Sequence, residues 1–281
     1  MLQDIRYAIK LLTRDRGFTL VAALALALGI GATTSLLTVV NAVILRGLPL
    51  EDSDRLVAIS MRDPRNRQLG MSYPDFDDWQ RASRSFSGMT LMLLPVAFSV
   101  SDGNHLPEQF WGPFTSANLF KVIGQRPFIG RDFIAEDDRP GAAPVVILGY
   151  GLWQTRYGGD PSILGRTIRV NGLQPTVVGV MRPDMKFPPN SDLWMTISQT
   201  NTPRVEGRGI RSFSLIARLA DGVTLEQARA EITNLARETA RTYPQSNQDL
   251  VPRWRPIRSR RTVPRPPWCI GRSWARRRSS C

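Results

Sequence analysis

The longest apolar segment of the chain runs over residues 18–45, which contain no charged side chain in 28 positions. An α-helix of this length reaches about 42 Å, whereas the hydrocarbon core of a bilayer is about 30 Å thick. Its first half is apolar on every face of a helix, a pattern typical of segments that lie in lipid. We therefore predict a transmembrane helix over 18–45. A cleaved secretory signal is the alternative, although the apolar region of such a signal spans only about 7 to 15 residues.

The charges that flank this segment predict its orientation. Four basic residues lie in residues 1–17, and only Arg46 follows closely before the acids at 51, 52 and 54. Because basic flanks stay on the cytoplasmic side, the N-terminus is expected in the cytoplasm and the rest of the chain beyond the inner membrane. Residues 1–17 also carry apolar side chains at helical spacing, which indicates a basic amphipathic helix on the inner leaflet. A positive flank without a helix of its own is the alternative.

A run of small residues occupies the second half of the apolar segment, from Gly29 through Gly31 to Ser35. Small side chains let two membrane helices approach closely, and hydroxyl groups can form hydrogen bonds between them. A lone lipid anchor needs no such surface. The run therefore predicts that this helix packs against other helices.

Residues 46–248 alternate between short apolar runs and amphipathic segments, which predicts a mixed α+β domain. Strands are expected over residues 55–60, 91–100, 144–148, 191–197 and 213–219, and a hairpin over 167–170 and 176–180 with Asn171-Gly172 in its turn. Helices are expected over residues 72–83, 151–157 and from 224 to just before Tyr243. Ser72 and Pro74 suit the start of the first helix, and Thr224 with Gln227 forms the capping-box pattern at the start of the last.

Candidate chemistry in this domain is sparse. Asp77 and Asp78 could form a metal pair, or serve with Asp75 at the positive end of a helix. Glu136, Asp137 and Asp138 could form a paired-carboxylate site, or a solvated loop. His105 is the sole histidine, and no cysteine precedes Cys269. These counts exclude histidine triads and cysteine metal sites. Because no nucleophile elbow or phosphate loop occurs either, we predict no enzyme, no catalytic residue and no cofactor.

The last residues, 249–281, differ in composition from the rest. Residues 251–281 hold ten arginines, no acid and both cysteines, and account for most of the net charge of +13. Lacking a periodic apolar pattern, this tail is predicted to be disordered. The chain has three lysines against 34 arginines, which suggests GC-rich coding. We interpret the tail as the product of a shifted reading frame, with an anion-binding tail as the alternative. Nucleic acid is not expected as a partner beyond the membrane.

Several motifs together resemble the permeases of MacB/FtsX-type ABC transporters, in the orphan form abundant in acidobacteria. The first membrane helix of that family is similar to residues 25–34 (Ala-Leu-Ala-Leu-Gly-Ile-Gly-Ala-Thr-Thr), 39–46 and 48–49. Its MacB-like periplasmic core domain is similar to residues 72–79 (Ser-Tyr-Pro-Asp-Phe-Asp-Asp-Trp), 116–120, 124–127, 130–131, 136–137, 145–153, 158–166 (Gly-Gly-Asp-Pro-Ser-Ile-Leu-Gly-Arg), 173–181 and 192–194. The resemblance covers about residues 1–248.

The resemblance implies a two-lobed mixed α/β periplasmic domain. A porter-like lobe would combine residues 46–117 and 205–248, and an inserted lobe would comprise 118–204. It further implies a homodimeric permease that couples a separate ABC ATPase to movements outside the membrane, for efflux or mechanical signalling, together with a periplasmic adaptor and the lipid bilayer. Family members continue into further membrane helices after this domain, so the chain resembles a truncated permease. A single-span anchored binding or adaptor module without transport is the alternative.

Overall fold

The computed structural model describes residues 17, 20, 25–31, 52–102, 105–185, 187–200 and 207–257. The chain divides into two compact units, residues 1–47 with 260–281 and residues 48–259. In the first unit, residues 25–31 are helical and exposed. The rest of the predicted segment 18–45, the predicted amphipathic helix and residues 258–281 lie outside the described residues. Within the described part of the chain, no helix is both long enough and apolar enough to cross a membrane.

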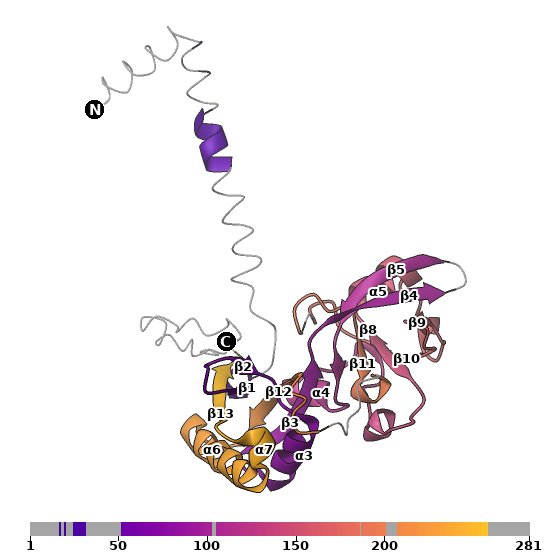
Figure 1. The fold of residues 1–281 in the computed structure, drawn as a ribbon. Coiled ribbons are helices and arrows are strands. Elements are labelled where there is room, and N and C mark those ends of the chain that lie inside the picture. Colours follow the sequence, from indigo (N-terminus) through magenta and orange to yellow (C-terminus); the bar gives the residue numbers. More distant parts are fainter. Residues whose placement is uncertain are drawn as a thin grey trace, which may run out of the picture. The chain divides into compact units, whose positions relative to one another are not determined.

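Two sheets and five helices are described in the second unit (Figure 1). The larger sheet has the order β13-β1-β12-β3-β6-β11-β8-β10-β7, with β2 paired to β1. Its strands are β1 (Leu56–Arg62), β2 (Gln68–Leu69), β3 (Phe86–Leu93), β6 (Phe114–Thr115), β7 (Ile129–Gly130), β8 (Val145–Leu148), β10 (Thr176–Val180), β11 (Leu193–Thr196), β12 (Phe213–Leu219) and β13 (Val251–Pro256). The smaller sheet contains β5 (His105–Gly112), β4 (Val96–Asp102) and β9 (Arg169–Val170). The helices are α3 (Tyr73–Ala82), α4 (Leu119–Ile123), α5 (Tyr150–Tyr157), α6 (Leu225–Thr242) and α7 (Pro244–Asn247).

Four antiparallel strands, β13, β1, β12 and β3, form the first part of the larger sheet. Because side chains alternate along a strand, β1 places Val57, Ile59 and Met61 on one face and Ala58 and Ser60 on the other. The first face packs against α3 and α6 in one apolar cluster. Both helices start where the sequence predicts: Ser72 caps α3, and Thr224 with Gln227 forms a complete capping box on α6.

The second part of the larger sheet is mixed. Strand β10 runs parallel to β8, whereas β11 and β7 are antiparallel to their neighbours β8 and β10. All four residues of β8 and of β11 are buried. One face packs with α5 and the three-stranded sheet around Phe98, Leu152 and Trp153. The α+β class predicted from the sequence is thus confirmed for the described domain.

One strand prediction was wrong. Residues 91–100 belong to two strands, because β3 ends at Leu93 and β4 begins at Val96, on either side of Pro95. The reversal predicted around Asn171 and Gly172 forms, because Val170 bridges Leu173 and Thr167 bridges Thr176, both antiparallel. The two turn residues have φ of 49° and 83°. Tertiary contacts then add further partners, since β9 also pairs with β4 and β10 with β8 and β7.

The prediction that the disordered tail begins at residue 249 was also wrong, because β13 extends the sheet to Pro256. Residue Ile257 donates its backbone N–H to Leu56 O at 2.9 Å, so the N–H groups of Arg255 and Arg253 also point toward β1. The ring nitrogens of Pro252 and Pro256 therefore lie on the outer edge, the position in which proline is compatible with a strand. Backbone pairing does not require the apolar periodicity on which the prediction depended.

Candidate functional site

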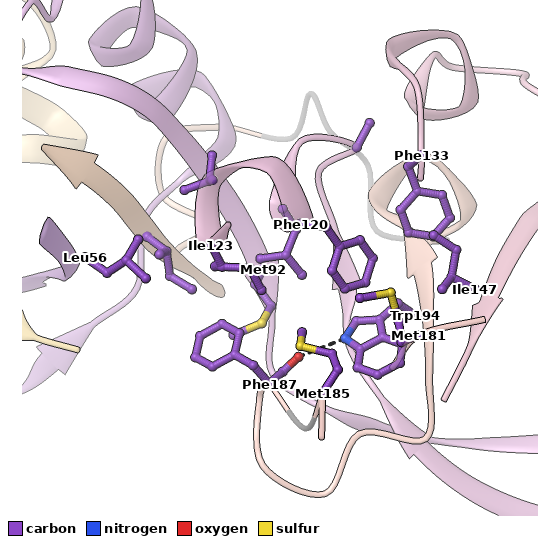
Figure 2. Close-up of a cluster of buried hydrophobic side chains, with 14 of the residues drawn as sticks. Leu56, Met92, Phe120, Ile123, Phe133, Ile147, Met181, Met185, Phe187 and Trp194 are labelled. Carbon is purple, nitrogen blue, oxygen red and sulfur yellow. Dashed lines mark hydrogen bonds between the residues drawn. The ribbon is translucent and has the colours of Figure 1, made fainter. Parts of the chain in front are cut away.

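A narrow junction connects the two parts of the larger sheet through β6. Strand β6 is only two residues long; it pairs with β3 at Met92↔Thr115 and with β11 at Met195↔Phe114 and Thr196↔Thr115. An apolar cluster spans the same place (Figure 2). It joins Leu56, Met92 and Ile216 of the first part to α4 and to Phe187 and Trp194 of the second.

Hydrogen bonds reinforce this junction. Ser116 Oγ accepts from the backbone N–H of Leu91 at 3.1 Å, and Thr115 Oγ1 donates to Leu91 O at 3.2 Å. Asn118 Nδ2 donates to Met89 O at 2.8 Å. Trp194 Nε1 donates to Phe187 O at 2.9 Å inside the apolar cluster (Figure 2). The residues that follow β6 are therefore fixed to β3 by both packing and polar contacts.

The acids at 136–138 lie beside this junction, and neither interpretation from the sequence describes them. Asp138 accepts from the backbone N–H of Ala117 at 3.3 Å and of Ser198 at 3.1 Å. Asp137 is buried and forms a two-point ion pair with Arg131, with N–O distances of 2.6 and 3.0 Å. Only Glu136 is exposed. Asp137 and Asp138 therefore connect the residues that follow β6 with the end of β11 and the residues after it, instead of forming a catalytic pair or a solvated loop.

Near this junction, Asp132 is the carboxyl group whose pKa departs most clearly from its ordinary value. Burial raises its pKa to about 6, although the N–H of Phe133 and the charge of Arg131 act in the opposite direction. The hydrogen bond that Arg131 donates to Asp137 raises the pKa of Arg131, so this guanidinium stays charged. The junction thus contains one carboxyl group that can change its charge near pH 6.

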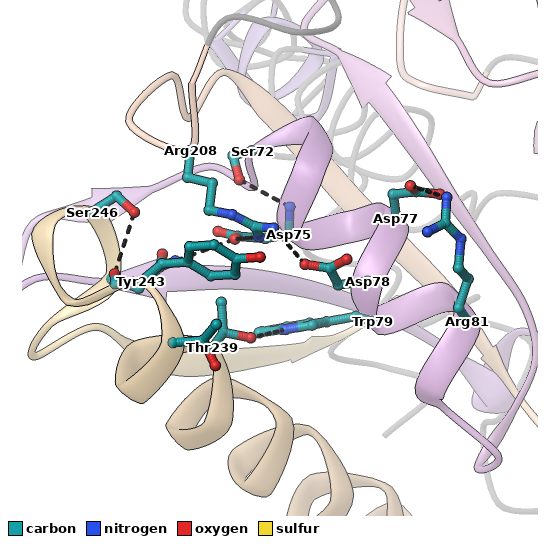
Figure 3. A network of polar contacts seen from close by, with 12 residues as sticks. Ser72, Asp75, Asp77, Asp78, Trp79, Arg81, Arg208, Thr239, Tyr243 and Ser246 are labelled. Atoms are coloured by element: carbon teal, nitrogen blue, oxygen red, sulfur yellow. Dashed lines mark hydrogen bonds and ion pairs between the residues drawn. The ribbon is translucent and has the colours of Figure 1, made fainter.

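A second polar cluster, the Asp75 cluster, joins α3 to the segment before β12 and to α7 (Figure 3). The carboxylate of Asp75 is 3% exposed and accepts from Arg208 at 2.6 Å, Arg211 at 2.9 Å and Asn247 at 3.2 Å. Arg208 also pairs with Asp78 and lies 3.5 Å from the centre of the Tyr243 ring. The cluster therefore ties α3 to two segments that lie 133 and 172 residues further along the chain.

The two arginines of the Asp75 cluster differ in their electrostatics. Burial lowers the pKa of Arg211, and the nearby charge of Asp75 only partly offsets this effect. Arg208 also loses solvent, but its hydrogen bonds with Asp75 and Asp78 outweigh this and raise its pKa. Since Arg211 is 6% exposed, its charge depends on Asp75 as a partner.

The proposed metal pair does not form. Asp77 pairs with Arg81 one turn along α3, and Asp78 pairs with Arg208 (Figure 3). Among the described residues no group of three or more histidine, cysteine or acidic side chains could hold a metal ion. The side chain of His105 and both cysteines lie outside the described residues. Asp75 lies in the first turn of α3, as one alternative predicted, but Asp75 and Asp78 act mainly as partners of a distant arginine.

A third cluster fixes the hairpin of β4 and β5 to α5. Arg156, whose side chain is 3% exposed, forms ion pairs with Asp102 at 2.9 Å and Glu108 at 3.2 Å, and donates to Leu106 O at 3.1 Å. This hairpin falls within the residues assigned to the porter-like lobe, yet it pairs with β9, which belongs to the inserted lobe. No pattern in the sequence predicts either arginine cluster, because the partners are distant along the chain.

This mixed α/β domain shares its fold with extracytoplasmic regions of MacB and of an ABC-type transporter. The chain belongs to the family of MacB-like periplasmic core domains, whose model matches residues 19–235. The resemblance inferred from the sequence motifs is thereby confirmed. None of the curated proteins matches the chain significantly.

Three solved structures share the fold. The periplasmic region of MacB from Actinobacillus actinomycetemcomitans is similar at 17% identity and a TM-score of 0.53, over 72% of this chain and 89% of that one. A domain of a putative permease from Porphyromonas gingivalis reaches 12% identity and 0.56, over 75% and 94%. The extracellular domain of the noncanonic ABC-type transporter YknZ from Gram-positive bacteria reaches 11% identity and 0.53, over 70% and 99%.

Proposed function

We propose that this chain is a permease-type subunit of an ABC exporter or of a mechanotransmission complex, which couples a separate ATPase to movements outside the membrane. The observation that carries the proposal is the family match over residues 19–235, because it includes both most of the apolar segment and the domain. In this proposal residues 18–45 span the inner membrane, residues 1–17 lie on its cytoplasmic side and the domain is extracytoplasmic.

The contacts of the domain support such a role. Strand β1 starts eleven residues after the end of the apolar segment, at Leu56, and so lies close to the membrane along the chain. Force applied there would pass through the braced strands β12 and β3 to the junction at β6. A domain that transmits movement needs stiff parts that meet at a narrow connection. The Asp75 cluster stiffens the first part, and the Arg156 cluster stiffens the second.

We also propose two lobes, with boundaries that the contacts refine. The porter-like lobe, residues 46–117 and 205–248, would no longer include the β4–β5 hairpin, because this hairpin pairs with β9. It would include β13, because β13 pairs with β1. Helix α4 would remain at the interface, because it packs against side chains from both parts. The proposed partners are a second copy of the chain, a separate ATPase, a periplasmic adaptor and the bilayer.

A cysteine scan of residues 25–31 tests the proposal. Cys269 and Cys281 are first changed to serine, and each single-cysteine variant is then oxidised in native membranes. A permease helix that packs through its small residues gives crosslinked species on one face of the helix, at Gly29→Cys with Ala25→Cys or at Gly31→Cys with Ala27→Cys. The other pair serves as the matched control and gives weaker crosslinking, since residues i and i+4 share a face and close approach depends on small side chains. Mass spectrometry of the crosslinked species identifies the partner helix.

The second candidate is a single-span anchored binding or adaptor module without transport. It requires only the apolar segment over residues 18–45 and the folded domain that follows it. This candidate predicts no crosslinked species at any position of the scan, or equal yields around the helix. Either result would contradict the permease proposal.

A further inference from the structure

A hollow of about 750 Å³ lies on the face of the larger sheet that faces away from α3 and α6. Register places Arg255 beside Ala58 and Arg253 beside Ser60, and directly paired residues share a face. Trp254, between the two arginines, is paired with Ile59 and packs on the opposite, helix-covered face. The exposed arginines therefore both line the hollow.

The hollow exists because helix α4 covers only part of this face of the sheet. Helix α4 covers Leu56, Met92 and Ile216, which are long apolar residues on the same face. Beyond α4 the floor consists of small side chains, Ala58, Ser60 and Ser214, and none of the helices described in this domain lies over them. The connection from β3 to β4 forms one wall, with Leu94 at 65% exposure and Pro95.

The charged side chains that line the hollow are all arginines. Arg253 and Arg255 reach it from β13, while Arg211 contributes to the wall but directs its guanidinium to Asp75. Within the described part of the chain, no aspartate or glutamate lines the hollow. The wall opposite the arginines is apolar, with Leu94, Pro95 and Val96. Two cations on one side and apolar side chains on the other complement a ligand with an anionic group and an apolar body.

We propose that this hollow binds a small amphipathic anion, a molecule with one carboxylate, sulfonate or phosphate group and an apolar body. Arg253 and Arg255 hold the anionic group through charge-assisted hydrogen bonds, and Leu94 and its neighbours cover the apolar body. The volume lies in the range of small-molecule sites, roughly 300 to 1,000 Å³, so the occupant is a free molecule. The proposal does not depend on transport.

Equilibrium dialysis of the full chain in phosphatidylcholine nanodiscs tests this site, with 2-naphthalenesulfonate as the probe and empty nanodiscs as the blank. The site predicts saturable binding of one probe per chain. Arg253→Gln with Arg255→Gln weakens binding about tenfold or more, because charged hydrogen bonds are lost. The matched control, Arg229→Gln with Arg241→Gln on the exposed side of α6, removes the same net charge and leaves the affinity unchanged.

Three further measurements distinguish binding at this site from nonspecific electrostatic attraction. The cation 2-naphthylmethylammonium binds at least about tenfold more weakly than the sulfonate, and Leu94→Ser weakens sulfonate binding severalfold. Nanodiscs with added phosphatidylglycerol give the same affinity, since the occupant is not a lipid headgroup. Equal loss in both arginine pairs, equal binding of the cation, an unchanged Leu94→Ser variant, competition by phosphatidylglycerol or the absence of saturable binding would each overturn the proposal.

Discussion

Replacing Asp75 by asparagine removes the negative charge at the centre of the Asp75 cluster. The carboxylate is 3% exposed and faces Arg208 and Arg211, whose side chains are 15% and 6% exposed. Removing one partner of a buried ion pair costs about 3 to 5 kcal/mol, because the remaining charge stays buried without compensation. We expect about 3 kcal/mol for Asp75→Asn, since Arg208 keeps Asp78 and an asparagine can still accept one hydrogen bond.

The matched control is Asp77→Asn, two residues along the same helix. Asp77 pairs with Arg81 across one turn of α3, and both side chains are largely accessible, at 38% and 73%. Such a pair contributes about 0.3 to 0.5 kcal/mol. Both substitutions remove one negative charge from α3, so the control accounts for the change in net charge.

The assay is unfolding of residues 48–259 by urea and, separately, by heat, both followed by circular dichroism. For a domain of this size, a loss of about 3 kcal/mol lowers Tm by roughly 6 to 12 °C. Asp75→Asn combined with Arg211→Met recovers part of the loss, because the unpaired buried cation is removed. The reasoning is refuted if Asp75→Asn costs no more than Asp77→Asn, or if the double variant is as unstable as the sum of its single changes.

Three other predictions concern the rest of the domain. Gly112→Ala lowers the free energy of unfolding by about 2 to 4 kcal/mol, because a Cβ there would lie 1.9 Å from Leu193 O. The control Gly151→Ala, in α5, places its Cβ in open space and is neutral or stabilising by up to about 1 kcal/mol. Urea titration measures both changes. Burial raises the pKa of Asp132 to about 6, so the folded state retains a proton that the unfolded chain has lost above about pH 4. The free energy of unfolding therefore falls as the pH rises from 4 to 6, by about 1 kcal/mol after solvent screening, and Asp132→Asn removes this slope. Arg156→Met releases the β4–β5 hairpin, so hydrogen exchange in residues 96–112 becomes faster than in β12.

Local signals in the sequence predicted several elements closely. Strand β12 has the bounds that its apolar run indicates, residues 213–219. Helix α6 begins after Thr224 and ends before Tyr243, because its capping box and the following Tyr-Pro pair act on neighbouring residues. Such signals depend on backbone hydrogen bonds within a few positions, and therefore survive without knowledge of the fold.

The remaining features depend on contacts between distant residues. Arg208 and Arg211 lie in a segment without periodic pattern, and nothing near them in sequence reveals Asp75 as their partner. Strand β13 was missed because prolines and arginines are compatible with an edge strand once β1 supplies the backbone partners. The pairing of β4 with β9 likewise depends on packing within the inserted lobe. Side-chain type alone could not select these partners.

The central claim is that residues 18–45 tether an extracytoplasmic permease-type domain to the inner membrane. Protease protection in spheroplasts tests it most directly, combined with alkaline extraction of the membranes. The account predicts that the chain stays in the membrane fraction and that external protease degrades residues 48–259 while a tag at the N-terminus is protected. Recovery of the intact chain in the soluble fraction, or protection of the domain in unbroken spheroplasts, would contradict it.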